Sequence, residues 1–125
     1  METRHLVALS VMGGIVLGAG VVQGLHAQAK PPAYLVAEVE VTDADTYKTY
    51  LEGTNPIIAK YGGKFIVRGG KTLSVAGDPP KRVVVSIFES LDKAEGYETD
   101  PAYKALVPIR DKSSKYRAYI VEGVN

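Results

Sequence analysis

Apolar and polar residues alternate along positions 34–41, which is the pattern of a β-strand that buries one face. The odd positions, from Leu35 to Val41, are all apolar, whereas the even positions include Glu38 and Glu40. This stretch is the first predicted strand, and it places Glu38 on the face opposite Leu35.

Three later ranges rich in β-forming residues predict the remaining strands. They cover residues 64–68, 82–89 and 117–122. Between the first two of these ranges, Gly69-Gly70 predicts a bulge or tight bend, followed by a short extended piece at 72–75. In the 82–89 strand we expect one face to carry Val83, Val85 and Ile87 and the other to carry Arg82, Val84, Ser86 and Phe88.

The segment after the first strand has its apolar residues at helical spacing. Asp43 is a suitable N-cap, and apolar side chains then recur every three or four residues from Tyr47 to Tyr61. Gly62-Gly63 predicts the end of this helix, because glycine accepts the backbone angles of a helix C-terminus. Pro56 predicts a kink or break near residues 53–56, since proline removes a backbone hydrogen bond.

A second helical region follows the third strand. Ser90 can cap a first piece that carries Ala94 and Tyr97. Asp100-Pro101 has the form of a new N-cap followed by proline at the first helical position, so a second piece begins there and carries Tyr103. The resulting order of strand, helix, strand, strand, helix, strand predicts an α+β, ferredoxin-like domain, a four-stranded antiparallel sheet with both helices on one face.

In this arrangement the face of the sheet away from the helices is too apolar to stay in water. We expect that face to carry Val36, Glu38, Ile66, Arg68, Val84, Ser86, Phe88, Tyr119 and Val121. Covering each apolar side chain contributes about 1.5–3 kcal/mol. A second copy packed sheet to sheet would cover them all, so the pattern predicts a twofold homodimer.

The composition excludes several kinds of chemistry. The chain has no Cys, and both of its His and both of its Met lie within the first 29 residues. Histidine-based haem or metal ligation, cysteine nucleophiles and Ser-His-Asp triads are therefore not expected, and we predict neither a cofactor nor a metal site. With 15 Lys and Arg against 14 Asp and Glu and no basic tract, nucleic acid is not an expected partner.

The first 29 residues have the pattern of a secretory signal peptide. Arg4 precedes an uncharged stretch at 6–22, and Ala27-Gln28-Ala29 offers the small residues that a signal peptidase accepts. Cleavage there would start the mature chain at Lys30, with an extended lead-in at 30–33 and a domain at 34–124. We therefore expect an exported protein, periplasmic or extracellular, without membrane contact after cleavage. An uncleaved membrane anchor is the alternative, since such a stretch is just long enough to span a bilayer.

Five short motifs resemble a known family in the same order. They are Ala33-Tyr34-Leu35-Val36-Ala37-Glu38-Val39-Glu40-Val41, Tyr61-Gly62-Gly63, Arg68-Gly69-Gly70, Lys81-Arg82-Val83-Val84-Val85 and Val121-Glu122-Gly123-Val124. This order resembles DUF1330, a family of the dimeric α/β-barrel superfamily. The resemblance implies a ferredoxin-like subunit and a homodimer. It implies no activity, because members of that superfamily differ in chemistry and fold alone does not carry function.

Glu38 and Arg68 are the first candidate site residues. Both are expected on the face between the two sheets, where a lone charge is costly and a pair is tolerable. Arg68 could clamp an anionic or hydroxylated ligand, and Glu38 could accept a hydrogen bond or act as a general base. The alternative is an ion pair that only stabilises the dimer.

Four more residues are expected on the same face, as ligand-binding candidates at the mouth or wall of a cavity: Arg82, Ser86, Phe88 and Tyr119. The sequence thus predicts an exported homodimer that binds a small molecule between its sheets. One alternative is a cofactor-independent isomerase or monooxygenase with Glu38 as the base, and another is a purely structural or partner-binding dimer.

Overall fold

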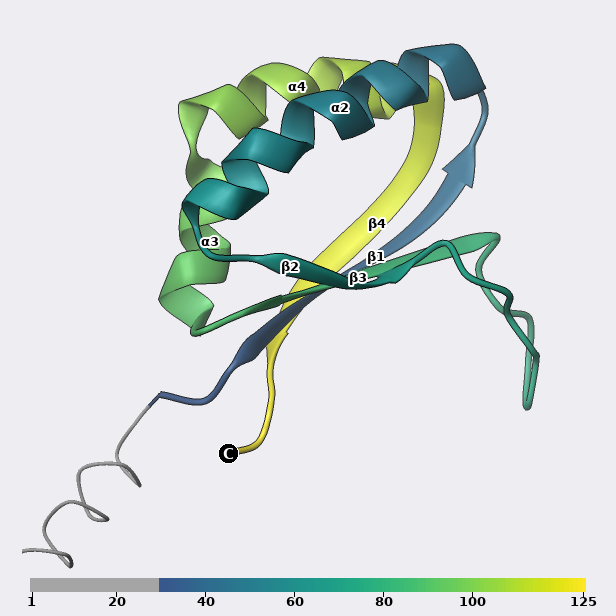
Figure 1. Cartoon of the computed structure of the whole chain (residues 1–125). Coiled ribbons are helices and arrows are strands. Elements are labelled where there is room, and N and C mark those ends of the chain that lie inside the picture. The colour runs from purple at the N-terminus through teal and green to yellow at the C-terminus, as the bar shows by residue number, and fades with distance from the viewer. Residues whose placement is uncertain (1–29) are drawn as a thin grey trace, which may run out of the picture. The chain divides into compact units, whose positions relative to one another are not determined.

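The computed structural model describes residues 30–125, so the predicted signal peptide lies outside the described residues. The domain contains four strands and three helices (Figure 1). In chain order they are β1 (Ala33–Val41), α2 (Ala44–Lys60), β2 (Lys64–Arg68), β3 (Arg82–Phe88), α3 (Leu91–Thr99), α4 (Pro101–Ser113) and β4 (Ser114–Glu122). No helix in this part of the chain has the length and hydrophobicity needed to cross a membrane.

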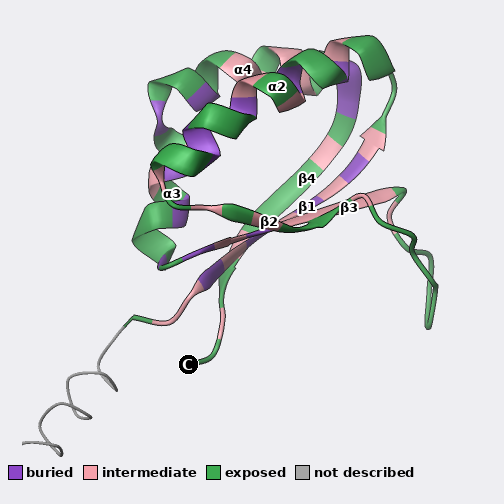
Figure 2. Cartoon of the chain, in the orientation of Figure 1, coloured by how far each residue is buried: buried purple, intermediate pink, exposed green. Residues whose placement is uncertain are grey.

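The four strands form one antiparallel sheet in the order β2-β3-β1-β4. All three helices lie on one side of this sheet (Figure 1). Buried residues gather where the helices face the sheet, including the odd positions of β1 from Ala33 to Val39 (Figure 2). The predicted α+β, ferredoxin-like fold is confirmed, with the second predicted helical region present as the separate helices α3 and α4.

The prediction of which face each residue of β3 occupies was wrong. Residues opposite each other in antiparallel strands share a face, and Leu35 lies opposite Ser86 while Ala33 lies opposite Phe88. Ser86 and Phe88 are therefore buried beneath the helices, with only 2% and 1% of their surfaces exposed. The other set, Val83, Val85 and Ile87, lies on the face away from the helices. Because β3 is apolar on both faces, its alternation does not identify the buried one.

A β-bulge in β2 changes the face of the residues that follow it. The pairing with β3 shifts between Phe65 and Val67, so that Val67 lies opposite Val85 and Arg68 lies opposite Val84. A shift of one residue moves every later side chain to the other face of the sheet. Arg68 therefore lies on the helix side, the reverse of its predicted place, and Val67 lies on the open side. The predicted extended piece at 72–75 is not a strand.

Helix α2 begins and ends as the sequence predicts. Asp43 accepts a hydrogen bond from the backbone N–H of Thr46, and Gly62 takes a φ of 71° just after the helix. The predicted break is absent, since α2 runs through Pro56 as one helix. Pro56 lies on the exposed side of α2, where water can bond the carbonyl that the proline leaves free.

Asp100 joins α3 to α4 and ties both to the end of α2. Its carboxylate accepts hydrogen bonds from the backbone N–H of Ala102, from the hydroxyl of Tyr61 at 2.6 Å and from Lys60 at 2.9 Å. These donors lower the pKa of Asp100 to about 2, with the Tyr61 hydroxyl the largest cause. The predicted N-cap at Asp100, with Pro101 in the first turn, is thus confirmed.

Tyrosine rings fill the centre of the core between helices and sheet. The rings of Tyr50 and Tyr103 are almost fully buried, and their hydroxyl oxygens lie 2.8 Å apart. Tyr47, Tyr97 and Tyr116 complete the cluster through ring contacts and shared cavity walls.

Candidate functional site

The open face of the sheet, the face away from the helices, carries a pair of opposite charges. Arg117 donates from Nη2 to both carboxylate oxygens of Glu38 at 2.8 Å, and the hydroxyl of Tyr119 donates to Oε2 at 3.0 Å. The Arg117 guanidinium, and after it the Tyr119 hydroxyl, lower the pKa of Glu38 below its ordinary value. Glu38 and Tyr119 thus lie on the predicted face, but Arg117 takes the place that was expected for Arg68.

Arg68 and Arg82 meet instead on the helix side of the sheet. They line a pocket of about 120 Å3 between α2 and the strands β2 and β3. The guanidinium of Arg68 lies 4.0 Å from the centre of the Phe65 ring, in the geometry of a cation–π contact. The guanidinium of Arg82 packs against Gly69, where a side-chain Cβ would collide with it, so Gly69 makes room for this arginine.

The arginine pocket, as we call this pocket, has more positive than negative charge. Its walls are formed by Lys48, Leu51, Glu52, Thr54, Asn55, Phe65, Arg68, Arg82 and Val84. Three of these side chains are cationic and one is a carboxylate. Within residues 30–125 neither arginine forms an ion pair, and the buried Nε of Arg82 has no hydrogen-bond partner. The excess of cations that form no ion pair suits this pocket to an anion.

A narrow cavity of about 30 Å3 lies beside the arginine pocket, toward the core. The two share Leu51, Thr54, Phe65 and Val84 as wall residues. Ser86 lines the inner cavity, together with Tyr47, Tyr50, Tyr97 and Tyr116. Burial raises the pKa of these four tyrosines, so their hydroxyls keep their protons and can donate hydrogen bonds. The volume suits a water molecule or one small substituent of a ligand.

Three of the six predicted site residues thus line the two neighbouring cavities on the helix side: Arg68 and Arg82 line the arginine pocket, and Ser86 lines the narrow inner cavity. Phe88 is a core residue whose ring packs against Tyr97 at 5.7 Å between centroids, and it lines neither of these two cavities. Glu38 and Tyr119 lie on the opposite face of the sheet. The predicted constellation is therefore divided in two, because the bulge in β2 and the pairing of β3 bring their residues under the helices.

The wall that α2 provides was not predicted from the sequence. Lys48, Leu51, Glu52 and Asn55 follow each other at helical spacing along one side of α2, beside its buried stripe. That helical spacing could have identified the α2 wall from the sequence. Arg117, which lies directly opposite Glu38 in the pairing of β1 with β4, was also not predicted as a site residue.

Residues 32–124 are matched by the family model of DUF1330, a domain of unknown function. The chain belongs to the DUF1330 family. The match covers all four strands and all three helices of the domain, and it confirms the family that the sequence motifs resemble. No curated protein matches this DUF1330 chain in sequence.

Solved structures with the same fold come from several organisms. A protein of unknown function from Rhodopseudomonas palustris is 18% identical to this DUF1330 chain, with 85% of this chain and 93% of that one covered and a TM-score of 0.63. An Arabidopsis thaliana protein is 16% identical over 78% and 92% of the two chains, with a TM-score of 0.57. SnoaB, a cofactor-independent oxygenase from Streptomyces nogalater, is 11% identical over 76% and 95%, with a TM-score of 0.55. At these identities the likeness shows the fold alone.

The described residues of this DUF1330 domain contain no group of three or more His, Asp or Glu side chains that could hold a metal ion. Three of the four charged groups of the arginine pocket are instead cations, which repel metal ions and attract anions. The chemistry that this pocket can perform directly is the binding of a negatively charged group beside an apolar wall.

Proposed function

We propose that this protein binds a small organic anion in the arginine pocket. The observation that carries the proposal is a pocket lined by both Arg68 and Arg82, two cations that form no ion pair within residues 30–125. The buried Nε of Arg82 also has no hydrogen-bond partner there. Paired guanidinium donors recognise carboxylates well, because their planar N–H groups match the two oxygens. A ligand carboxylate would supply the acceptor that the protein does not.

The shape of the pocket limits the ligand to a small molecule with an apolar body. Its volume of about 120 Å3 is below the range of about 300–1,000 Å3 that is usual for drug-sized ligands. Leu51, Phe65 and Val84 provide an apolar wall, and the narrow inner cavity offers hydroxyl groups deeper in the core. A small aromatic or branched carboxylate fits these features.

Benzoate should therefore bind to the protein more tightly than benzyl alcohol, which has a similar ring and no charge. Replacing Arg82 by glutamine should weaken benzoate binding by about tenfold, the loss expected for one charge-assisted hydrogen-bonding group. Arg68→Gln should also weaken it. Titration followed by NMR of the labelled protein measures both affinities and shows whether the shifts centre on Phe65 and Val84.

Lys104→Gln is the matched control, because Lys104 is an exposed cation on α4 outside this pocket. It should leave benzoate affinity unchanged. Equal binding of benzoate and benzyl alcohol, or equal effects of Arg82→Gln and Lys104→Gln, would remove the basis for an anion site. In that case the arginines would act only in packing.

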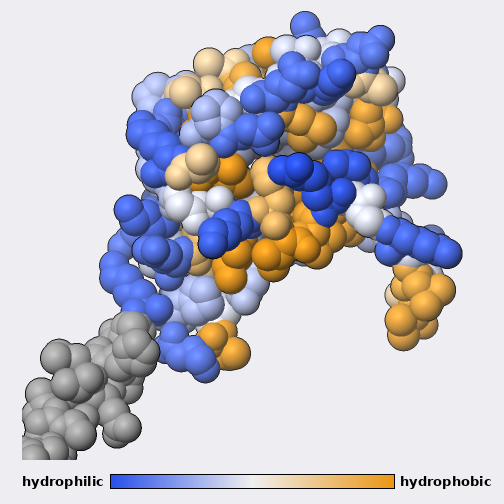
Figure 3. Space-filling view, viewed as in Figure 1, coloured by the Kyte–Doolittle hydropathy of each residue, from blue (hydrophilic) through white to orange (hydrophobic). Residues whose placement is uncertain are grey.

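We further propose that two copies associate through the open face of the sheet. Val36, Val67, Val83, Val85, Ile87, Tyr119 and Val121 give that face its apolar character. Tyr119 and Val121 are each nearly half exposed, and hydrophobic surface extends along the side of the sheet away from the helices (Figure 3). The Glu38–Arg117 pair neutralises its own charge, so a second copy of the same face can cover it without an unpaired charge.

The loop between β2 and β3 supports this mode of association. It extends beyond the sheet on the side away from the helices (Figure 1), and it exposes 85% of Leu73 and 95% of Val75. Apolar side chains so exposed gain stability when a partner covers them. In a sheet-to-sheet dimer, the loop of each copy would reach alongside the other copy.

We also propose that the protein is exported with removal of its first 29 residues, on the basis of the apolar stretch and the Ala27-Gln28-Ala29 site. Protein expressed from the full sequence and recovered from the exported fraction should begin at Lys30. Intact mass spectrometry measures this directly. Recovery of the full-length chain in the membrane fraction would favour the retained anchor instead.

Catalysis without a cofactor, with Glu38 as the base, has less support. Arg117 and Tyr119 already bond the Glu38 carboxylate and lower its pKa, so it is a weak proton acceptor. SnoaB is a cofactor-independent oxygenase, but its likeness to this chain extends to the fold only. The features of Glu38 agree better with an ion pair on a face between subunits.

A further inference from the structure

A second hollow lies on the other side of the core, over β4. It has a volume of about 510 Å3, which is within the range of small-molecule sites. Leu35, Ala118 and Ile120 form its apolar floor, and Glu98 of α3 and Arg110 of α4 line it from above. We name it the β4 groove. Neither Glu98 nor Arg110 was among the site residues predicted from the sequence.

Glu98 is in an unfavourable state in this groove. Its Oε1 atom is buried and has no hydrogen-bond partner within residues 30–125. Burial raises the pKa of Glu98, while the positive charge of Arg110 lowers it to a smaller extent. A buried carboxylate oxygen that accepts no hydrogen bond lowers the stability of the fold. A positively charged hydrogen-bond donor would offset that cost.

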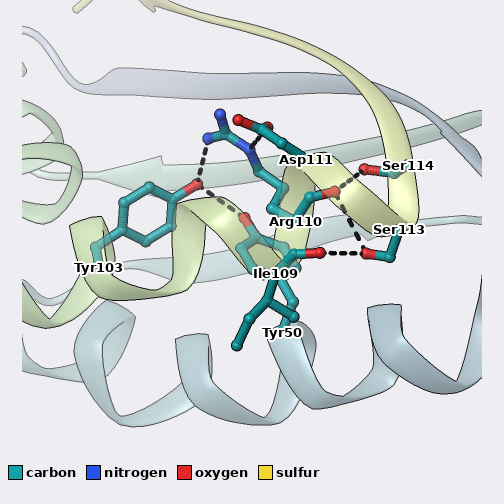
Figure 4. A network of polar contacts seen from close by, with 7 residues as sticks. All are labelled: Tyr50, Tyr103, Ile109, Arg110, Asp111, Ser113 and Ser114. Carbon is teal, nitrogen blue, oxygen red and sulfur yellow. Dashed lines mark hydrogen bonds and ion pairs between the residues drawn. The ribbon is translucent and has the colours of Figure 1, made fainter.

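Arg110 is held in place but keeps one nitrogen available. Its Nε donates to Asp111 at 2.9 Å and its Nη1 donates to the Tyr103 hydroxyl at 3.2 Å (Figure 4). The guanidinium also lies 4.4 Å from the centre of the Tyr116 ring. The third nitrogen, Nη2, makes no hydrogen bond with any residue that the structure describes. Arg110 is therefore a fixed cation with one free donor group.

Glu98 and Arg110 line one groove without forming an ion pair. One ion pair of the described domain joins Arg110 to its neighbour Asp111, and none of the ion pairs there includes Glu98. Because both charges line the groove and no ion pair joins them, a molecule bound there can pair with each of them. Such a molecule needs a cationic donor for Glu98 and an anionic acceptor for Arg110.

We propose that the β4 groove binds a small zwitterion with an apolar body, its ammonium group at Glu98 and its carboxylate at Arg110. The apolar body would lie on Leu35, Ala118 and Ile120. This site is separate from the arginine pocket, because Glu98 and Arg110 line only the groove while Arg68 and Arg82 line only the pocket. The proposed zwitterion site can therefore be confirmed or rejected independently of the proposed anion site.

The test compares three probes on the full protein: 4-(aminomethyl)benzoate, benzoate and benzylamine. The zwitterion should bind in the groove about tenfold more tightly than either singly charged probe, because only it satisfies both charges. NMR titration should place the zwitterion by shifts at Ala118 and Ile120. Benzoate bound in the arginine pocket is recognised by shifts at Val84 and is scored separately.

Glu98→Gln keeps the shape of the side chain and removes its charge. It should reduce the affinity for 4-(aminomethyl)benzoate to that for benzoate at the same groove. Glu95→Gln, on the exposed side of the same helix, is the matched control and should change nothing. Equal affinity of the three probes, shifts away from the groove, or equal behaviour of the two variants would overturn the proposal. A thermal unfolding curve confirms that each variant is folded.

Discussion

Replacing Val85 by glutamate should convert the protein from a dimer to a monomer. Val85 lies on the open face of the sheet between Val36 of β1 and Val67 of β2. A twofold interface contains both copies of the new carboxylate, so the cost of burying an unpaired charge is counted twice. We expect the dissociation constant of the dimer to rise on the order of a thousandfold, which sedimentation velocity over a range of concentrations measures.

Leu91→Glu is the control for this substitution. Leu91 is also an apolar residue with 39% of its surface exposed, but it lies in the first turn of α3, on the helix side of the sheet. A carboxylate in the first turn of a helix is favourable, so this variant should stay folded and dimeric. If Val85→Glu remains a dimer, the two copies associate through some other surface. A monomeric wild-type protein would contradict the sheet-to-sheet dimer itself.

The expected effect of Val85→Glu depends on the apolar character of the open face. The sequence indicated an apolar open face, and this holds even though four of the nine residues assigned to it lie on the helix side. Val84, Ser86 and Phe88 lie under the helices, and Val83, Val85 and Ile87 take their places. The residues that take their places are all apolar, so the exchange leaves the open face at least as apolar as predicted.

The first strand was predictable because its two faces differ. Its odd positions are apolar throughout and its even positions include Glu38, so only one orientation buries the core. The caps were predictable for a similar reason, since Asp43, Ser90 and Asp100 each offer a side-chain oxygen where a helix begins. Local chemistry fixes these features, and no distant contact is needed to specify them.

The site was less predictable because it depends on pairing between distant strands. The Gly69-Gly70 pair suggested a bulge, but the shift in register occurs before it, between Phe65 and Val67. That shift carries Arg68 to the helix side, where it shares a pocket with Arg82. Nothing in the local sequence of β2 shows whether the bulge lies at Gly69-Gly70 or between Phe65 and Val67. The sequence alone therefore could not predict that Arg68 shares a pocket with Arg82.

The tyrosine core gives the second large effect. Tyr103→Ala should lower the free energy of unfolding by about 3–5 kcal/mol, as for other large aromatic residues removed from a core. Only 1% of Tyr103 is exposed, and its ring lies 4.7 Å from that of Tyr97 and 6.2 Å from that of Tyr50, between centroids. Such a loss is a large share of the total stability of a small domain.

Tyr103→Phe separates the two contributions of this residue. It keeps the ring and removes the hydroxyl that lies 2.8 Å from the Tyr50 hydroxyl and accepts from Arg110. The expected cost is about 1–2 kcal/mol, because two polar groups lose a partner while the packing stays. Urea unfolding at one fixed protein concentration measures both variants, since association would otherwise change the apparent stability. If phenylalanine cost as much as alanine, hydrogen bonding by the hydroxyl, rather than burial of the ring, would be what holds the helices on the sheet.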